Sequence, residues 1–227
     1  MKREQTEPVV AIDGPAGSGK STAARTLARN LGWTYLDTGA IYRTLGWMAV
    51  QKGVSLEDEE ALIALCPALE DLSFRWSEKG DLLVFLGERD ITRQIRGEEA
   101  GRWASDVSRH PGVRKALLEL QRSFARRGPL VTEGRDTGTV VFPRAQWKFY
   151  LTASLEERAR RRLKEMGLEE TPENLEKVKK AIKERDLQDS TRPVAPLKKA
   201  KDAIELDTTG LSPQEVVEFI KRLIKEG

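Results

Sequence analysis

Residues 14–21 match the pattern G-x-x-x-x-G-K-[ST] at every fixed position, with the sequence Gly14-Pro15-Ala16-Gly17-Ser18-Gly19-Lys20-Ser21. In such a loop the glycines let backbone N–H groups turn inward around phosphate groups, beside the positive end of the following helix dipole. Lys20 is placed to reach the β- and γ-phosphates of a nucleotide, and the Ser21 hydroxyl is placed to ligate Mg²⁺. We therefore expect the segment from Gly14 to Thr22 to bind a nucleoside triphosphate. A glycine-rich turn that only starts a helix is the structural alternative, and the complete motif argues against it.

This loop alone fits a kinase, an ATPase or a GTPase switch. A guanine-binding N-K-x-D motif is missing, because neither Asn30 nor Asn174 starts one. Asp207-Thr208-Thr209-Gly210 does match D-x-x-G, but it lies near the C-terminus and is better explained as the loop into the final helix. The GTPase interpretation is therefore poorly supported.

The segment Asp37-Thr38-Gly39-Ala40-Ile41-Tyr42-Arg43 follows a predicted strand. Open parallel sheets bind ligands at the carboxyl ends of their strands. We expect Thr38 to cap the next helix and Arg43 to bind a phosphate. A structural cap followed by a surface arginine would explain the same residues.

A second arginine, Arg135, lies in the segment Glu133-Gly134-Arg135-Asp136-Thr137-Gly138, which also follows a predicted strand. An Arg-Asp pair between glycines at this edge of a sheet is poorly explained as packing. Arg135 offers a bidentate grip on a phosphate. Asp136 offers an acceptor for an exocyclic amine.

Two charged helices follow. The run Arg158, Arg160, Arg161 and Arg162 is by default a solvated basic helix face. Arg185, Asp189 and Arg192 are spaced by four and three residues, so a helix places them on one face. Taken alone, that pattern is typical of a surface ion-pair stripe.

These segments need a sheet and helices to position them. Short apolar runs predict strands at 9–12, 35–36, 130–132, 148–151 and 203–206. Helices are predicted between them, at about 21–31, 40–51, 57–65, 98–107, 112–127, 155–166, 173–190 and from 213 onwards. Residues 72–86 predict an antiparallel hairpin around Glu78-Lys79-Gly80. The alternation predicts an α/β fold: a doubly wound parallel sheet of about five strands with helices on both faces, and the hairpin as a small antiparallel insert.

Composition limits the class of protein. A chain of 227 residues with 39 basic and 36 acidic residues, net charge +3, fits one domain and argues against nucleic acid as a partner. The single cysteine, Cys66, excludes an intrachain disulfide framework and fits a reducing cytoplasm. The polar start MKREQTEP has no signal-peptide pattern, and no apolar run is long enough for a membrane span. We expect a cytoplasmic protein without membrane contact.

Together, these motifs resemble the bacterial cytidylate kinase family over roughly residues 9–208. The resemblance rests on the phosphate-binding loop, the LDTGAIYR segment, the hairpin insert at 72–97, the EGRDTGTVVFP segment and ERDLQDSTRPVAPL at 184–197. It implies transfer of the γ-phosphoryl group of ATP, with Mg²⁺, to CMP and also dCMP, with UMP as a weaker acceptor. It further implies that the insert binds the acceptor, that a helical lid closes over ATP, and that the protein is a monomer.

The resemblance also implies roles for individual residues. Ser105, Arg114 and Asp136 correspond to residues that recognise cytosine, and Arg43 and Arg135 to ligands of the acceptor phosphate. The remaining acceptor-site residues are Thr38, Tyr42, Arg185, Asp189 and Arg192, and the lid carries Arg158 and Arg162. Lys20, Arg43, Arg135, Arg158 and Arg162 form the expected catalytic set. Glu133 departs from the family, in which Asp is commoner, but keeps the charge.

We expect one kinase domain over residues 1–227, with a core of 9–39, 108–152 and 197–227, an acceptor-binding region of 40–107 and a lid of about 153–192. The acceptor nucleophile would be a phosphate oxygen, largely ionised at neutral pH because its second pKa is about 6, so no general base is needed. Two alternatives stay open: a P-loop kinase for another small acceptor, and a nucleotide-binding regulatory protein without transfer activity.

Overall fold

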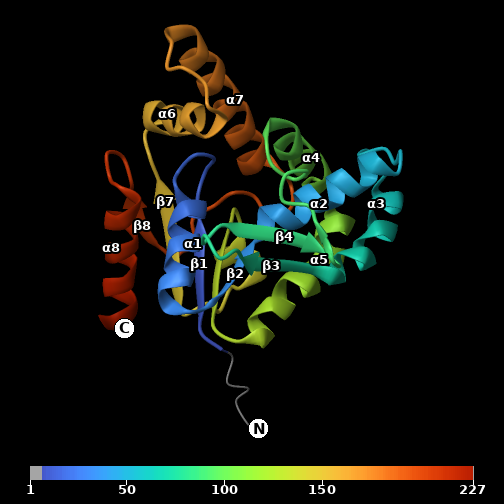
Figure 1. Ribbon diagram of the computed structural model, residues 1–227, viewed down its shortest axis with the longest axis horizontal. Coiled ribbons are helices and arrows are strands. Elements are labelled where there is room, and N and C mark those ends of the chain that lie inside the picture. The colour runs from blue at the N-terminus through green and yellow to red at the C-terminus, as the bar shows by residue number, and fades with distance from the viewer. Residues whose placement is uncertain (1–6, 227) are drawn as a thin grey trace. The chain divides into compact units, whose positions relative to one another are not determined.

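The computed structural model describes residues 7–226, so the signal-peptide prediction for the first residues lies largely outside the described part (Figure 1). The chain divides into two compact units, Met1–Tyr35 with Ala125–Gly227 and Leu36–Phe124, and each is described by itself. The domain boundaries expected from the sequence stay a prediction. Within residues 7–226 we find no helix with the length and hydrophobicity needed to cross a membrane.

A five-stranded sheet has the order β2-β6-β1-β7-β8, with β2 at Thr34–Asp37, β6 at Leu130–Gly134, β1 at Val9–Asp13, β7 at Trp147–Thr152 and β8 at Ile204–Asp207. The central strand β1 is buried throughout, as expected for a continuous apolar run covered on both faces. It pairs in parallel with β6 and β7, and β7 pairs in parallel with β8. The predicted parallel α/β fold is confirmed.

Helix α1 (Lys20–Leu31) packs against β1, β6 and α8 (Pro213–Glu226). Gly32 ends α1 with φ +66°, a left-handed conformation that favours glycine, as the sequence predicted. In α8 the buried stripe of Val216, Val217 and Ile220 faces the core. The phosphate-binding loop thus lies between a buried strand and a helix that is packed along its length.

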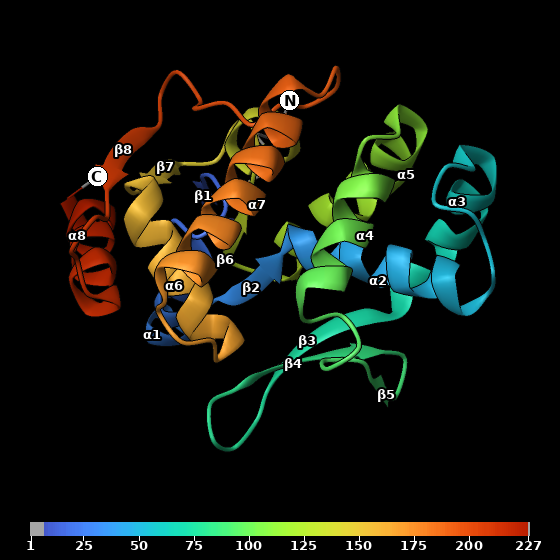
Figure 2. The same ribbon diagram turned by 90° about the horizontal axis from the view of Figure 1, so that it is seen from above.

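Helices α6 (Leu155–Met166) and α7 (Pro172–Thr191) form a helical hairpin (Figure 2). Ser154 caps α6 and Thr171 caps α7 through their side-chain oxygens. The two helices share a small apolar core of their own, made of Ala159, Leu163, Val178 and Ile182. The hairpin therefore has internal packing that does not depend on the sheet.

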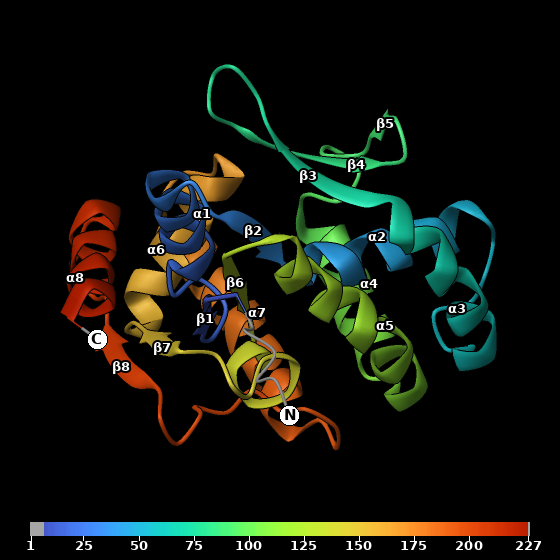
Figure 3. The ribbon, with the colours of Figure 1, turned by 90° about the horizontal axis from the view of Figure 1, so that it is seen from below.

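The second unit contains helices and a small sheet (Figure 3). Its elements are α2 (Thr38–Gln51), α3 (Glu59–Leu65), a 3₁₀ turn (Cys66–Asp71), β3 (Leu72–Trp76), β4 (Leu82–Leu86), β5 (Arg89–Asp90), α4 (Glu98–Ser108) and α5 (Pro111–Ser123). Strands β3 and β4 pair antiparallel, which confirms the predicted hairpin, and the short β5 extends it. Helix α2 packs closely on α4, since a Cβ at Gly46 would lie 2.5 Å from Trp103 Cβ.

The start of α2 corrects one expectation. Asp37, not Thr38, caps this helix: its carboxylate accepts a hydrogen bond from Ala40 N at 2.9 Å. The same carboxylate accepts from Arg43 at 2.6 Å, so it holds a helix end and an arginine together. Thr38 is the first residue of the helix and is buried.

Candidate active site

The glycines of the phosphate-binding loop are required by its geometry. Gly17 and Gly19 have φ of +76° and +82°. A Cβ at Gly14 would lie 2.1 Å from Leu151 O, and one at Gly17 would lie 2.9 Å from Arg158 O. The loop is therefore closely surrounded by backbone, and side chains at these positions would displace it.

Lys20 is 5% exposed, and its ammonium group donates to Pro15 O at 2.9 Å. Burial is the main cause that lowers its pKa to about 7, and the positive charge of Arg135 acts in the same direction. Glu133 opposes the shift. A buried lysine with a lowered pKa is suited to gain its proton when phosphate arrives.

The Ser21 hydroxyl donates to Glu133 Oε1 at 2.7 Å. Glu133 is the residue of β6 that pairs with Ile12, and it is buried. A hydroxyl and a carboxylate beside the loop are oxygen ligands of the kind that Mg²⁺ prefers. Within residues 7–226 we find no cluster of three or more His, Cys, Asp or Glu side chains that could hold a metal ion.

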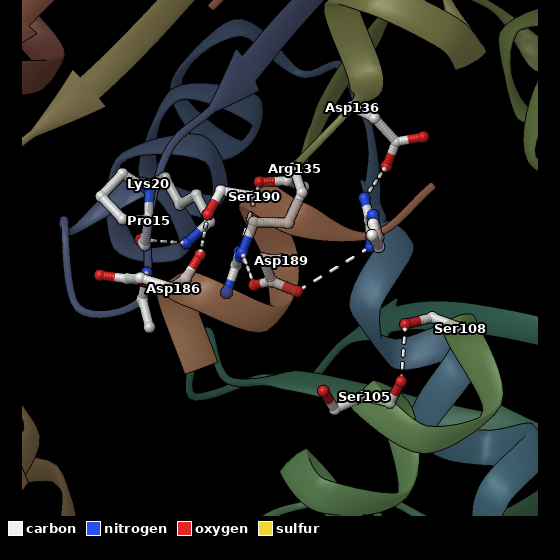
Figure 4. A network of polar contacts seen from close by, with 12 residues as sticks. Pro15, Lys20, Ser105, Ser108, Arg135, Asp136, Asp186, Asp189 and Ser190 are labelled. Carbon is white, nitrogen blue, oxygen red and sulfur yellow. Dashed lines mark hydrogen bonds and ion pairs between the residues drawn. The ribbon is translucent and has the colours of Figure 1, made fainter. Parts of the chain in front are cut away.

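Four residues of the first unit that the sequence predicts to bind the acceptor form one ion-pair network: Arg135, Asp136, Asp189 and Arg192 (Figure 4). Arg135 Nε donates to Asp189 Oδ2 at 2.7 Å, and Arg192 donates to Asp136 Oδ1 at 3.2 Å. Arg192 also lies 3.9 Å from Asp189 Oδ1. Asp189 and Arg192 do lie together, although Arg192 follows the last residue of α7 and is not helical. They contact Arg135 and Asp136, so they are not the surface ion-pair stripe that the spacing alone suggested.

Electrostatics fixes the protonation of this network. Burial opposes ionisation of Asp189, but the guanidinium groups of Arg135, Arg185 and Arg192 outweigh it and lower the Asp189 pKa. Burial likewise opposes the charge of Arg135, and Asp189 overcomes it and raises the Arg135 pKa. Both groups are therefore ionised at neutral pH.

The turn after α7 is tied to the network. Arg192 Nε donates to Ala195 O at 2.6 Å, and Leu197 N donates to Asp189 O at 2.7 Å. Ala195 has φ +51°, and it is the one non-glycine residue of the described chain with positive φ. Alanine in this region stores about 1–2 kcal/mol of strain, which the surrounding hydrogen bonds hold.

The two predicted lid arginines differ in surroundings. Arg158 forms an ion pair with Asp186 and donates to Ala16 O at 3.0 Å. Asp186 in turn accepts from Ala16 N at 3.1 Å, so both polar groups of Ala16 meet the hairpin. Arg162 instead pairs with Glu165 at 3.1 Å on the exposed side of α6. The structure brings Arg158, and not Arg162, to the phosphate-binding loop.

A pocket of about 440 Å³ adjoins the loop, bounded by α1, α6 and the segment after β8. Arg161 lines it and donates to Thr208 O at 2.6 Å and to Glu157 Oε1 at 2.8 Å. Leu211 and Val216 supply apolar surface. Sequence reasoning missed Arg161 and Asp186, because nothing in a run of charges shows which members face inward. The only signal was the D-x-x-G segment, which contains Thr208.

The second unit holds the other predicted residues. The Arg114 guanidinium lies 5.4 Å from the centre of the Tyr42 ring and donates to Ser108 O at 3.4 Å. The Ser108 hydroxyl donates to Ser105 O at 3.2 Å, so Ser105 and Arg114 share Ser108 as a neighbour (Figure 4). Arg114 is 7% exposed, which is unusual for arginine.

Comparisons with known proteins agree with one another. The sequence profile of a family described as cytidylate kinase matches residues 10–226. Two cytidylate kinases from Streptococcus pneumoniae, of strains 70585 and Hungary19A-6, are each 50% identical over 212 residues, which cover 93% of this chain and 95% of each relative. An uncharacterized protein from Eubacterium ventriosum has a solved structure similar over 97% of this chain and 100% of its own, with a TM-score of 0.55 and 10% identity. That likeness concerns the fold alone.

Proposed function

The chain belongs to the cytidylate kinase family, and from this premise we propose how its residues act in transferring the γ-phosphoryl group of ATP to CMP. The protein is an ATP-dependent nucleoside monophosphate kinase, which converts ATP and CMP into ADP and CDP. We extend the acceptor range to dCMP, with UMP as a weaker acceptor. A cytoplasmic, monomeric enzyme without nucleic acid partners stays our expectation.

The donor nucleotide is assigned to the first unit. Residues 14–22 surround its phosphates, with Lys20 on the β- and γ-phosphates. The adjoining pocket of about 440 Å³ has the size of a small-ligand site, and we assign the adenosine to it. Arg161 is held there by Thr208 and Glu157, so its guanidinium is ordered before a base arrives.

Ser21 and Glu133 fit a magnesium ion, since both offer oxygen atoms and already lie within hydrogen-bonding distance of each other. When bound, Mg²⁺ neutralises negative charge on the phosphates that react. Its ligands from this chain would be the Ser21 hydroxyl directly and the Glu133 carboxylate, either directly or through water.

For the acceptor we assign Arg135 and Arg43 to the phosphate of CMP. Cytosine presents an amine donor at N4 and acceptors at N3 and O2, and a carboxylate, an arginine and a serine complement these groups. We assign those roles to Asp136, Arg114 and Ser105. The other acceptor-site residues of the proposal are Thr38, Tyr42, Arg185, Asp189 and Arg192.

The chemistry then needs alignment and charge neutralisation. The attacking phosphate oxygen is already ionised, so no side chain has to remove a proton. Lys20 and the arginines, with Arg158 from the lid, stabilise the charge that develops on the transferred group. We assign Arg162 the same role, for which it would have to leave its ion pair with Glu165. The observation that supports this most strongly is Arg135, which is partly buried and is oriented by Asp189 within the unit that carries Lys20.

The test is a panel of nucleoside monophosphates with ATP and Mg²⁺, in which ADP formation is followed by a coupled assay. We expect CMP and dCMP to give the highest kcat/KM, and Lys20→Met to reduce it strongly. A higher kcat/KM with a different acceptor would favour a kinase of other specificity. No ADP formation with any acceptor, from a folded protein that binds ATP, would favour the regulatory alternative.

A further inference from the structure

Asp13 is a buried carboxylate for which the mechanism above has no use. It is the last residue of β1 and is 4% exposed. Its Oδ1 accepts from Thr137 N at 2.9 Å and from the Thr137 hydroxyl at 2.8 Å, and its Oδ2 accepts from Gly138 N at 2.8 Å. Both oxygens therefore accept hydrogen bonds from one short segment of chain, Thr137 and Gly138.

The position of Asp13 in the sequence connects it to the donor site. Gly14, the next residue, begins the phosphate-binding loop and has no room for a side chain, because a Cβ there would meet Leu151 O at 2.1 Å. Any displacement of Asp13 would therefore move the entry to the loop. The loop that we assign to the donor phosphates therefore continues directly from Asp13 in the backbone.

Asp13 also contacts both ends of the segment 134–138, which carries Arg135 and Asp136. In the parallel ladder Asp13 is paired with Gly134, the last residue of β6. Its side chain binds Thr137 and Gly138 on the other side. Arg135 and Asp136 lie between these two attachment points.

The packing around this connection leaves little freedom. Thr137 is fully buried and begins a one-turn π-helix (Thr137–Val141). A Cβ at Gly138 would lie 3.3 Å from Lys148 Cδ and 3.4 Å from Asp13 Oδ2, so the backbone at Gly138 lies close to both side chains. Burial raises the Asp13 pKa, and the hydrogen bonds from Thr137 and Gly138 oppose that rise, so the same donors that fix the carboxylate also favour its charged form.

We propose that Asp13 is a positioning residue that fixes the phosphate-binding loop relative to Arg135 and Asp136, and so aligns the donor and acceptor phosphates for transfer. The inference rests on the proposed roles of Lys20 and Arg135. Each loop binds its own ligand through its own groups, whereas the distance between the two ligands depends on Asp13. Misplacement of reacting groups by about 1 Å lowers rates by about 10²-fold.

The decisive variant is Asp13→Asn, which keeps the size of the side chain but replaces one carboxylate oxygen by an NH₂ group. That group is a donor, and it would face the backbone N–H of Thr137 or Gly138, which is also a donor. We expect kcat per folded molecule to fall about 10- to 100-fold. The KM values for ATP and CMP, and CMP binding measured calorimetrically, should change less than about threefold, since each loop keeps its own binding groups. Val217→Ala in α8 is the control: it removes buried side-chain volume in the same unit at a residue that we assign to neither ligand, and it should leave kcat per folded molecule unchanged.

Two variants of Thr137 test the proposal even if Asp13→Asn does not fold. Thr137→Val removes the hydroxyl bond and keeps both backbone bonds, so kcat should fall by a smaller factor, and Thr137→Ser should restore it. Normal kcat per folded molecule in Asp13→Asn, or in Thr137→Val where the first variant does not fold, would overturn the proposal. So would a loss confined to KM. Failure of the proposed function itself would appear separately, as a wild-type protein without CMP-dependent ADP formation.

Discussion

Binding of ATP is expected to place a proton on Lys20. In the free protein burial lowers the Lys20 pKa to about 7, from an ordinary value of 10.5. At pH 8 only about one molecule in eleven would then carry the charged lysine. Phosphate oxygens favour the ammonium form, so the pKa returns towards its ordinary value in the complex. Each ATP bound at pH 8 should therefore take up about 0.9 proton at Lys20.

The measurement is isothermal titration calorimetry of ATP binding in buffers of different ionisation enthalpy. Lys20→Met is the control, because it cannot take up a proton at residue 20, whereas the protons that ATP itself takes up or releases on binding are unchanged. The difference between wild type and variant should rise from about 0.1 proton at pH 6 to about 0.5 at pH 7 and 0.9 at pH 8. Linkage also makes the wild-type affinity about tenfold weaker at pH 8 than at pH 6, relative to the variant.

An equal proton uptake by both proteins at all three pH values would refute this reasoning. It would mean that the Lys20 ammonium is already stable in the free protein, held by Pro15 O and Glu133 strongly enough to offset burial. The affinity difference between pH 6 and pH 8 would then disappear as well.

Three other predictions concern single side chains. Lys20→Met should lower kcat about 10²–10³-fold without loss of thermal stability, and near-normal turnover would remove this lysine from the mechanism. Asp136 should make CMP about 5- to 150-fold better than UMP in kcat/KM, and Asp136→Asn should narrow that ratio; an unchanged ratio would show that Asp136 does not recognise the base. Asp189 has a lowered pKa, so its stabilising charge is present above about pH 4 and is lost as the pH falls further. Urea unfolding should therefore show Asp189→Asn to be less stable than wild type at pH 7, with a difference that shrinks below pH 4; a constant difference would contradict the pairing with Arg135.

The fold was predictable because its signals are local. Buried parallel strands such as Val9–Asp13 are continuous apolar runs, and Gly32 marks the end of α1 by a conformation that only glycine adopts easily. The antiparallel hairpin of β3 and β4 likewise follows from two apolar runs around Glu78-Lys79-Gly80. In each case the residues that decide the structure are neighbours in the chain.

What the sequence did not show depends on contacts between distant segments. Thr38 and Asp37 are both good caps, and the choice of Asp37 depends on its second bond, to Arg43. The sequence gives no sign that the Asp13 side chain binds Thr137, because the two residues are far apart in the chain. Arg161 cannot be distinguished from its basic neighbours in α6 until Thr208 is brought to it.

The order of the strands has a consequence for how the chain folds. The central strand β1 is made first, but its partners β6 and β7 follow about 120 and about 140 residues later, so this sheet has high contact order and is slow to form. The intervening unit, Leu36–Phe124, is one continuous stretch of chain that contains its own antiparallel sheet and helices. We therefore expect this unit to fold while the rest of the chain is still being synthesised. We therefore expect the apolar strand Val9–Asp13 to stay unpaired on the ribosome until Leu130–Gly134 emerges. Until then, we expect this nascent apolar strand to be exposed to aggregation.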